Sequence, residues 1–159
     1  LVQSEREVAV LQRLGGRALE QVVLGRDDDQ SAAVVRQREA AEFDVMAAGE
    51  GIETVLSVRS VLPALPSMAA LSAAHLSAIL FPASLRRLYI ARDNDSAGDG
   101  AMAILAQRAG AAGIETMVLA PQLGDFNEDL RLLGHDALAA RLTDQIVPQD
   151  VARFMLLAA

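Results

Sequence analysis

The stretch that decides the fold is LYIARDNDSAG, residues 88–98. Its apolar start has the composition of a buried strand, its end begins a helical pattern, and Asp93 and Asp95 lie at the junction. A second segment, AAGEGIET at residues 47–54, repeats this order with Glu50 at the junction. In a parallel α/β sheet, the residues that directly follow the strands gather at one edge, where ligands bind. The sequence therefore predicts that three carboxylates, those of Glu50, Asp93 and Asp95, meet at one magnesium site.

Strand-like and helix-like segments alternate on both sides of these two junctions. Four segments have the apolar composition of strands: 43–48, 63–68, 85–91 and 114–119. The segments that follow have helical composition, and this alternation predicts right-handed crossovers and a parallel sheet covered on both faces. Pro66 indicates that the second strand lies at an edge or pairs irregularly. The expected fold class is therefore α/β, with a Rossmann-like parallel sheet of roughly four strands flanked by helices.

The same pattern divides the chain into three parts. Residues 45–135 contain the alternating units and are expected to form the main domain. Residues 136–159 are expected to form a helical C-terminal extension. Residues 1–44 are expected to form an N-terminal appendage, in which a capping-box pattern favours a helix. Its expected elements are a helix over 4–14, resumed over 18–24, a loop over 25–30, and a short edge strand at 33–35 before a segment of helical composition.

The composition limits the chemistry and the surroundings of the protein. The chain has no cysteine, which removes disulfides, thiol nucleophiles and cysteine-bound zinc. No apolar run approaches the roughly 20 residues that cross a bilayer, and the first residues lack the pattern of a secretory signal, so we expect no membrane contact and a cytoplasmic location. The net charge of -7 disfavours strong autonomous binding to a phosphate backbone. Binding of nucleic acid would need metal ions or another, basic domain.

Asp93 and Asp95 are separated by one residue. In an extended segment such side chains point the same way, so both carboxylates can face one cation while Asn94 points elsewhere. Magnesium suits this arrangement because it prefers hard oxygen ligands and usually takes few carboxylates together with substrate phosphates. One of the two aspartates can instead cap the following helix. Glu50 also has two interpretations, because its flanking glycines suit either a catalytic acid at a sharp corner or a solvated turn.

A third acidic cluster is DFNED, residues 125–129, which follows the fourth expected strand and therefore lies at the same sheet edge. Asp125 can add an oxygen ligand, and Asp129 can reach a second metal ion. Alternatively, Asp125 caps the next helix and Asp129 is an ordinary first-turn acid. Arg92 adjoins the aspartate pair, where it can hold a phosphate or form a structural ion pair with a neighbouring acid.

Taken in order, the motifs GEGIET, ARDNDSAGDGA and GDFNEDL resemble the Toprim domain. This domain is the catalytic module of bacterial primases, type IA and type II topoisomerases and certain nucleases. The resemblance covers residues 45–135 and is strongest to the Toprim domains of phage-type and plasmid-type primases and primase-helicases. It implies that Glu50 acts as a general base or acid. It also implies that Asp93 and Asp95 bind Mg²⁺, for which Mn²⁺ can substitute.

The resemblance is less complete at the third motif. Asp125 and Asp129 lie where primase relatives place further acids, so the resemblance extends the implied metal site to them. A lysine often precedes this cluster in such relatives, whereas Gly124 stands there in this chain. This departure puts contact of the third motif with a phosphate or nucleotide in doubt.

The implied function is Mg²⁺-dependent nucleotidyl transfer by the Toprim module of a DNA primase-like protein, which makes RNA primers on single-stranded DNA. The implied partners are single-stranded DNA and nucleotides, reached through additional basic domains, and a helicase. A nuclease that uses water at the same centre is the first alternative, and a non-catalytic interaction module with vestigial acids is the second. Covalent strand cleavage is disfavoured, because the only tyrosine, Tyr89, lies within an expected core strand. Isolated polymerase activity is not expected, since no zinc module or basic template-binding subdomain is visible.

Overall fold

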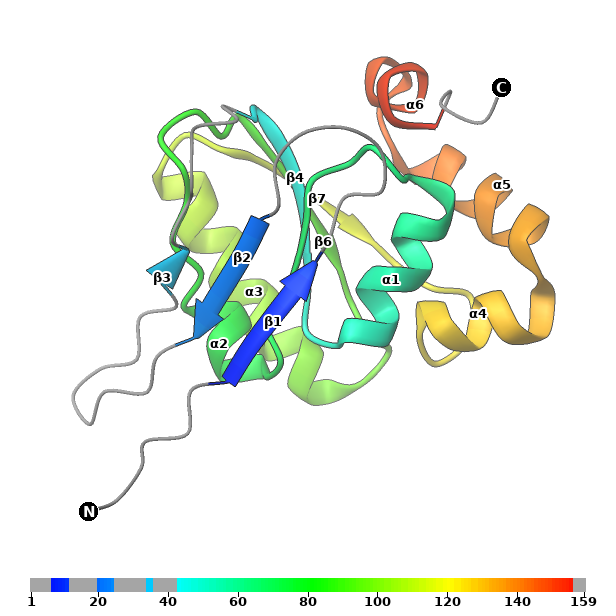
Figure 1. The fold of residues 1–159 in the computed structure, drawn as a ribbon, viewed down its shortest axis with the longest axis horizontal. Helices are drawn as coiled ribbons and strands as arrows, with labels where there is room; N and C mark the ends of the chain where they lie inside the picture. The colour runs from blue at the N-terminus through cyan, green and yellow to red at the C-terminus, as the bar shows by residue number, and fades with distance from the viewer. Residues whose placement is uncertain (1–6, 12–19, 25–33, 36–42, 156–159) are drawn as a thin grey trace.

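The computed structural model describes residues 7–11, 20–24, 34–35 and 43–155 of the chain (Figure 1). In these residues the central element is a parallel sheet of four strands in the order β5-β4-β6-β7. The strands are β4 (Val45–Gly49), β5 (Ser67–Ala69), β6 (Arg87–Ala91) and β7 (Glu115–Leu119). All the strands expected between residues 43 and 119 are present, with β5 at an edge, and the predicted fold class is confirmed.

Helices cover both faces of this sheet. Within the described residues they are α1 (Ile52–Val61), α2 (Ala73–Ser77), α3 (Ser96–Ala111), α4 (Phe126–Leu133), α5 (His135–Gln145) and α6 (Pro148–Phe154). One apolar core lies between the sheet and α2 and α3, and a second lies between the sheet and α1, α4, α5 and α6 (Figure 1). None of the helices in the described part of the chain is both long and apolar enough to span a membrane.

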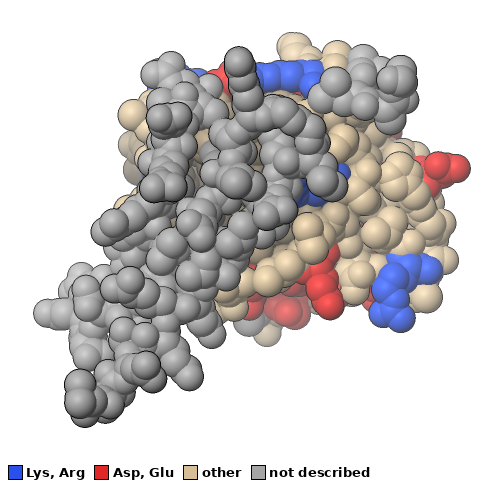
Figure 2. Space-filling view, viewed as in Figure 1, with Lys and Arg blue, Asp and Glu red and all other residues tan. Residues whose placement is uncertain are grey.

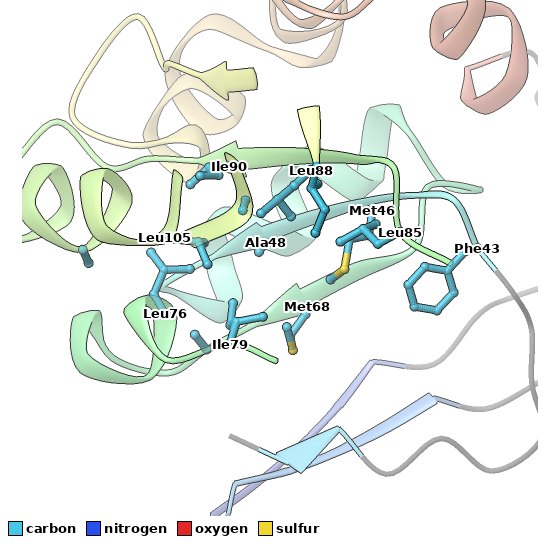
Figure 3. Packing of buried hydrophobic residues seen from close by; sticks show 14 residues of the cluster. Phe43, Met46, Ala48, Met68, Leu76, Ile79, Leu85, Leu88, Ile90 and Leu105 are labelled. Atoms are coloured by element: carbon cyan, nitrogen blue, oxygen red, sulfur yellow. The ribbon is translucent and has the colours of Figure 1, made fainter. Parts of the chain in front are cut away.

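The two cores form because side chains alternate between the faces of each strand. In β4, Met46 and Ala48 belong to the core under α2 and α3, which Figure 3 shows, and Val45 and Ala47 belong to the other core. The residues of β6 alternate in the same way. Strands that are buried on both faces have continuous apolar sequences rather than alternating ones. This explains why the central strands were recognisable in the sequence.

Three further strands precede the parallel sheet: β1 (Glu7–Leu11), β2 (Glu20–Leu24) and β3 (Val34–Val35). They form an antiparallel sheet in the order β1-β2-β3. The helices predicted over 4–14 and 18–24 are therefore wrong at the described positions. The apolar spacing there fits a helix as well as a strand, and the valines favour strands because branched side chains suit a pleated surface. The short strand expected at 33–35 is present as β3, and the loop expected at 25–30 lies outside the described residues.

Candidate functional site

Three parallel strands end side by side at the edge where the acidic motifs lie. The last residues of β4, β6 and β7 are paired with one another, so these strands end at the same level. Glu50 directly follows β4, and Asp93 and Asp95 follow β6. Asp125 follows β7, at the start of α4. Figure 2 shows acidic side chains gathered along the lower edge of the described surface, which is the edge at which α1 begins in Figure 1.

Close packing of β4 against α1 determines the sharp turn of the chain at Glu50, between these two elements. A Cβ atom on Gly49 would lie 2.9 Å from Cγ2 of Val55 and 3.2 Å from the carbonyl oxygen of Ala91. A side chain at this position would force its neighbours to shift, so glycine suits the close approach of the first turn of α1 to the strand. The amide of Leu71 donates a hydrogen bond of 2.8 Å to the carbonyl of Glu50, which ties the corner to the segment after β5.

The acids at this edge lie close enough for the charges of neighbouring acids to oppose the ionisation of Glu50 and Asp93. Burial raises the pKa of Glu50, and the negative charges of Asp93 and Asp95 raise it further. The pKa of Asp93 is also raised, chiefly by burial and in addition by the charges of Asp125 and Asp95, against the opposing effect of a hydrogen bond. The structure therefore brings together four of the acids that the sequence singled out.

Carboxylate oxygens, which the acids at this edge supply, are ligands that a hard cation such as Mg²⁺ prefers. Mg²⁺ is usually held by one or two carboxylates and completed by water and substrate phosphates. Among the residues that the structure describes, no three or more acidic, histidine or cysteine side chains are arranged to hold a metal ion. This finding lends no support to a cation held by all of the predicted acids together. A cation here would also offset the repulsion that raises the pKa of Glu50 and Asp93.

The loop before α4 uses its acids to bind its own backbone. Asp125 caps α4, because its carboxylate accepts a hydrogen bond of 2.6 Å from the amide of Glu128. Asp129 is 1% exposed, and its two carboxylate oxygens accept hydrogen bonds of 2.7 Å from the amides of Gln122 and Leu123. Asp129 therefore has a structural role, and these contacts lend no support to the prediction that it binds metal.

Local hydrogen bonding accounts for the glycine at position 124. The amide of Gly124 donates to Oε2 of Glu128 at 2.8 Å. A Cβ atom on Gly124 would lie 2.8 Å from the same oxygen. A side chain at this position would therefore shift the carboxylate of Glu128, which lies at the end of a flexible side chain.

Asn94, between the two aspartates, joins the loop after β6 to the loop after β7. Its backbone amide donates to the carbonyl of Gly124 at 2.8 Å, and its side-chain nitrogen donates to the carbonyl of Leu123. Arg92 donates to the side-chain oxygen of Asn94 at 2.6 Å and forms an ion pair with Asp99 at 3.2 Å. The structural ion pair considered for Arg92 is therefore present, and phosphate binding by Arg92 stays a prediction.

Thr54 is a residue of this edge to which the sequence motifs assigned no role. It is buried at the third position of α1, and its hydroxyl donates to Oδ1 of Asp93 at 2.8 Å. Its place within GEGIET, in the first turn of the helix that follows Glu50, was a signal in the sequence. Its partner could not be read from the sequence, because Asp93 lies in the loop after another strand.

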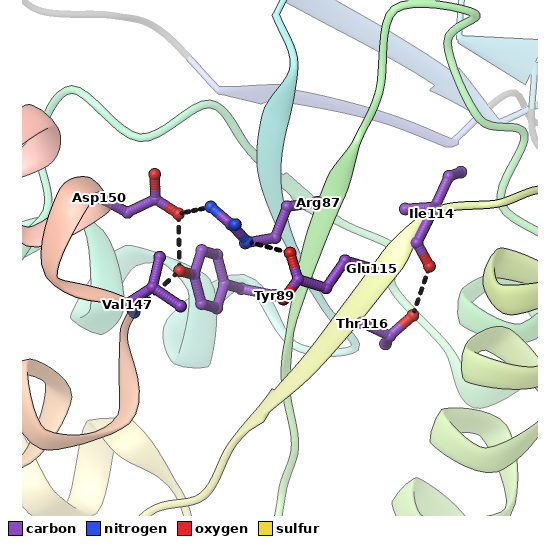
Figure 4. A network of polar contacts seen from close by, with 7 residues as sticks. All are labelled: Arg87, Tyr89, Ile114, Glu115, Thr116, Val147 and Asp150. Atoms are coloured by element: carbon purple, nitrogen blue, oxygen red, sulfur yellow. Dashed lines mark hydrogen bonds and ion pairs between the residues drawn. The ribbon is translucent and has the colours of Figure 1, made fainter.

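Polar residues at the opposite edge of the sheet form a separate network (Figure 4). Asp150 of α6 is buried, and its Oδ2 accepts hydrogen bonds from the hydroxyl of Tyr89 at 2.7 Å and from Nη1 of Arg87 at 2.8 Å. Arg87 also pairs with Glu115 at 2.8 Å. Tyr89 is fully buried, as its place in a central strand predicted, so it is no candidate for covalent strand cleavage.

An open parallel sheet with acids gathered at the carboxyl ends of its strands is typical of α/β proteins that bind ligands at this edge. Comparison with known families narrows this class, since a sequence model described as the Toprim domain matches residues 45–136. The match covers more than half of the chain. The chain belongs to the Toprim domain family.

One similar solved structure is that of the Aquifex aeolicus primase, comprising its zinc-binding and RNA polymerase domains. The two chains are 18% identical, with a TM-score of 0.47, and the similarity covers 89% of this chain and 40% of that chain. This chain therefore spans less than half the length of that neighbour. No curated protein matches the chain. The family assignment rests on the domain match alone.

Proposed function

We propose that the chain is the Toprim catalytic module of a DNA primase-like protein and that it transfers nucleotides in a Mg²⁺-dependent reaction. The product is an RNA primer on single-stranded DNA. The observation that carries the proposal is the convergence of Glu50 with the Asp93 and Asp95 pair at the carboxyl edge of a Toprim sheet. The resemblance of the three motifs to phage-type and plasmid-type primases supports this choice of substrate.

The proposed roles follow from the chemistry of the acids. Asp93 and Asp95 hold the cation, which, when bound, stabilises the negative charge that builds on the phosphorus oxygens and on the leaving pyrophosphate. Glu50 accepts the proton of the ribose 3′-hydroxyl as that oxygen attacks the α-phosphorus and pyrophosphate leaves. The raised pKa of Glu50 supports this role, because a general base is most effective when its pKa lies near the operating pH.

The charge of the chain supports a need for partners. A net charge of -7 repels a nucleic-acid backbone, so this module depends on additional basic domains to hold template and nucleotides. A helicase that supplies single-stranded DNA is a further partner that fits the proposal, because priming requires an unpaired template.

The direct test is a priming assay with the full-length protein. The protein is incubated with Mg²⁺ or Mn²⁺, labelled single-stranded DNA and ribonucleotides, and we expect ribonucleotide products complementary to the template. Asp93→Asn and Asp95→Asn should each lower the rate by at least about a hundredfold, because they remove charge that holds the cation at the reacting phosphate. An unchanged rate in both variants would contradict the proposal.

The same assay separates the two alternatives. Shortened DNA strands without extension would show that water is the attacking group and that the module is a nuclease. Calorimetry that finds no binding of divalent ions, together with an Asp93→Ala, Asp95→Ala double variant that retains full function, would show a non-catalytic interaction module. Either result replaces the proposal.

A further inference from the structure

Two buried hydroxyl side chains in α1 use their hydrogen bonds differently. Ser57 is 4% exposed and donates to the carbonyl of Glu53, four residues earlier in the same helix, at 2.8 Å. A serine or threonine within a helix commonly satisfies its hydroxyl in this local way. Thr54 is 3% exposed and donates instead to Oδ1 of Asp93, 39 residues away in the sequence, at 2.8 Å. The bond of Thr54 therefore joins the helix after β4 to the aspartate pair after β6.

The fold fixes the position of the Thr54 hydroxyl. The neighbouring residue, Val55, packs so closely on β4 that a Cβ atom on Gly49 would lie 2.9 Å from it. The branched side chain of threonine also has few χ1 rotamers in a helix. Asp93, in contrast, lies in the loop after β6. The rigid partner is therefore Thr54, and the group that it orients is the carboxylate of Asp93.

We propose that Thr54 is a positioning residue that orients the carboxylate of Asp93 for cation binding. This inference rests on the proposed function, since it takes Asp93 as a metal ligand. The negative charges of Asp95 and Asp125 act on Asp93, and they disfavour any orientation that brings its carboxylate closer to them. The hydrogen bond from Thr54 opposes that repulsion at one carboxylate oxygen and leaves the second oxygen for a cation.

Hydrogen bonds to metal-ligating carboxylates have a measurable effect on metal sites. Their loss typically weakens metal binding by about ten- to a hundredfold, because the ligand is no longer held in the orientation that the metal requires. A buried threonine with a purely structural role would affect the stability of the metal-free protein and leave the affinity of the folded protein for metal unchanged. Metal affinity and stability therefore distinguish the two roles.

The test compares three substitutions in α1 of the full-length protein. Thr54→Val keeps the shape and removes the hydroxyl, Thr54→Ser keeps the hydroxyl, and Ser57→Ala removes a buried hydroxyl that binds within the helix. Mn²⁺ binding is measured by electron paramagnetic resonance titration, and the stability of the metal-free protein is measured by urea unfolding. We expect Thr54→Val to raise the Kd for Mn²⁺ by about tenfold or more, and the other two variants to leave it within about twofold.

The outcomes separate this inference from the proposed function. If the wild-type protein binds no Mn²⁺, the proposed function fails whatever Thr54 does. If the wild-type protein binds Mn²⁺ and folded Thr54→Val binds it equally well, the positioning role is wrong and the proposed function stands. Equal weakening by Thr54→Ser would assign the effect to packing and would also overturn the inference. If Thr54→Val does not fold, Thr54→Ala provides the same comparison with a smaller side chain.

Discussion

The two edges of the parallel sheet differ in the surroundings of their acidic side chains. At the edge where the strands begin, Asp44 pairs with Arg153 at 2.7 Å. Arg87 at the same edge pairs with Glu115 and Asp150, both at 2.8 Å. At the edge where the strands end, burial and the charges of neighbouring acids instead raise the pKa of Glu50 and Asp93. The acids at the first edge stabilise the fold, whereas Glu50 and Asp93 have raised pKa values, which is typical of functional sites.

The largest stability effect is expected at the first edge, for Asp150→Ala. The side chain of Asp150 is 4% exposed, and its loss leaves Arg87 without its buried partner and removes the acceptor of the Tyr89 hydroxyl. Removal of one partner from a buried, hydrogen-bonded pair is strongly destabilising, so we expect the free energy of unfolding to fall by about 3 kcal/mol. Urea unfolding of the metal-free protein measures this change.

Glu115→Ala is the matched control, because it removes the other carboxylate that pairs with Arg87. The side chain of Glu115 is 55% exposed, and surface ion pairs contribute little, so the loss should stay below about 1 kcal/mol. Similar losses for the two variants would show that burial does not distinguish them, and the interpretation of this edge as a stabilising network would be wrong.

The second prediction concerns packing at the other edge. Gly49→Ala places a Cβ atom 2.9 Å from Val55, so α1 must move away from β4. We expect a loss of about 2 kcal/mol in unfolding free energy, typical of overpacking. Gly51→Ala is the control, because its Cβ atom would meet only Thr54, at an ordinary contact distance of 3.7 Å. A stable Gly49→Ala protein would show that the corner at Glu50 does not depend on this close approach.

The central sheet and the acids at its edge were predictable because their signals are local. An apolar strand that is followed at once by an acid, as β4 is by Glu50, needs no knowledge of the rest of the fold. The role of Asp129 was not predictable, because its carboxylate binds amides of the preceding loop, and the sequence does not show how that loop folds back. The burial of Asp150 was equally hidden, since first-turn acids are usually exposed and only the docking of α6 onto Tyr89 reveals its partner.

The N-terminal strands could not be predicted from the sequence for a different reason. The apolar residues of β1 and β2 satisfy both helical and strand spacing, and the choice between them depends on pairing between separate segments. A capping-box pattern at Ser4 favoured the helix locally. Tertiary pairing overrides such local preferences, which is why this part of the fold could not be predicted from the sequence.

The third prediction tests how the two loops of the second edge are joined. Asn94→Asp keeps the shape of the side chain but cannot donate to the carbonyl of Leu123, and it adds a charge between Asp93 and Asp95. We expect a loss of about 1 kcal/mol in the unfolding free energy of the metal-free protein. Mg²⁺ should recover part of this loss, because it offsets the added charge. Urea unfolding with and without Mg²⁺ measures both effects, and equal stability of the variant and the wild type would exclude the hydrogen bond as a support of the site.

The smallest expected effect is on the pH dependence of the unfolding free energy. An acid at one edge and an acid at the other should change this free energy in opposite directions. The pKa of Glu50 is raised from its ordinary value of 4.5, so its ionisation reduces stability as the pH rises above that value. Glu50→Gln should therefore stabilise the metal-free protein near neutral pH. The gain should stay below about 1 kcal/mol because the group is partly solvated, and it should vanish near pH 4 and in Mg²⁺.

Asp44, at the other edge, should show the opposite sign. The pKa of Asp44 is lowered from 3.8, chiefly by its hydrogen bond with Arg153. The stability that Asp44 contributes is therefore present above that pH and is lost as the pH falls through the lowered pKa. Asp44→Asn should accordingly destabilise the protein at neutral pH and lose this effect in acid. Urea unfolding between pH 3 and pH 8 compares the two variants, and a change of the same sign in both would mean that the two edges do not differ in their electrostatics.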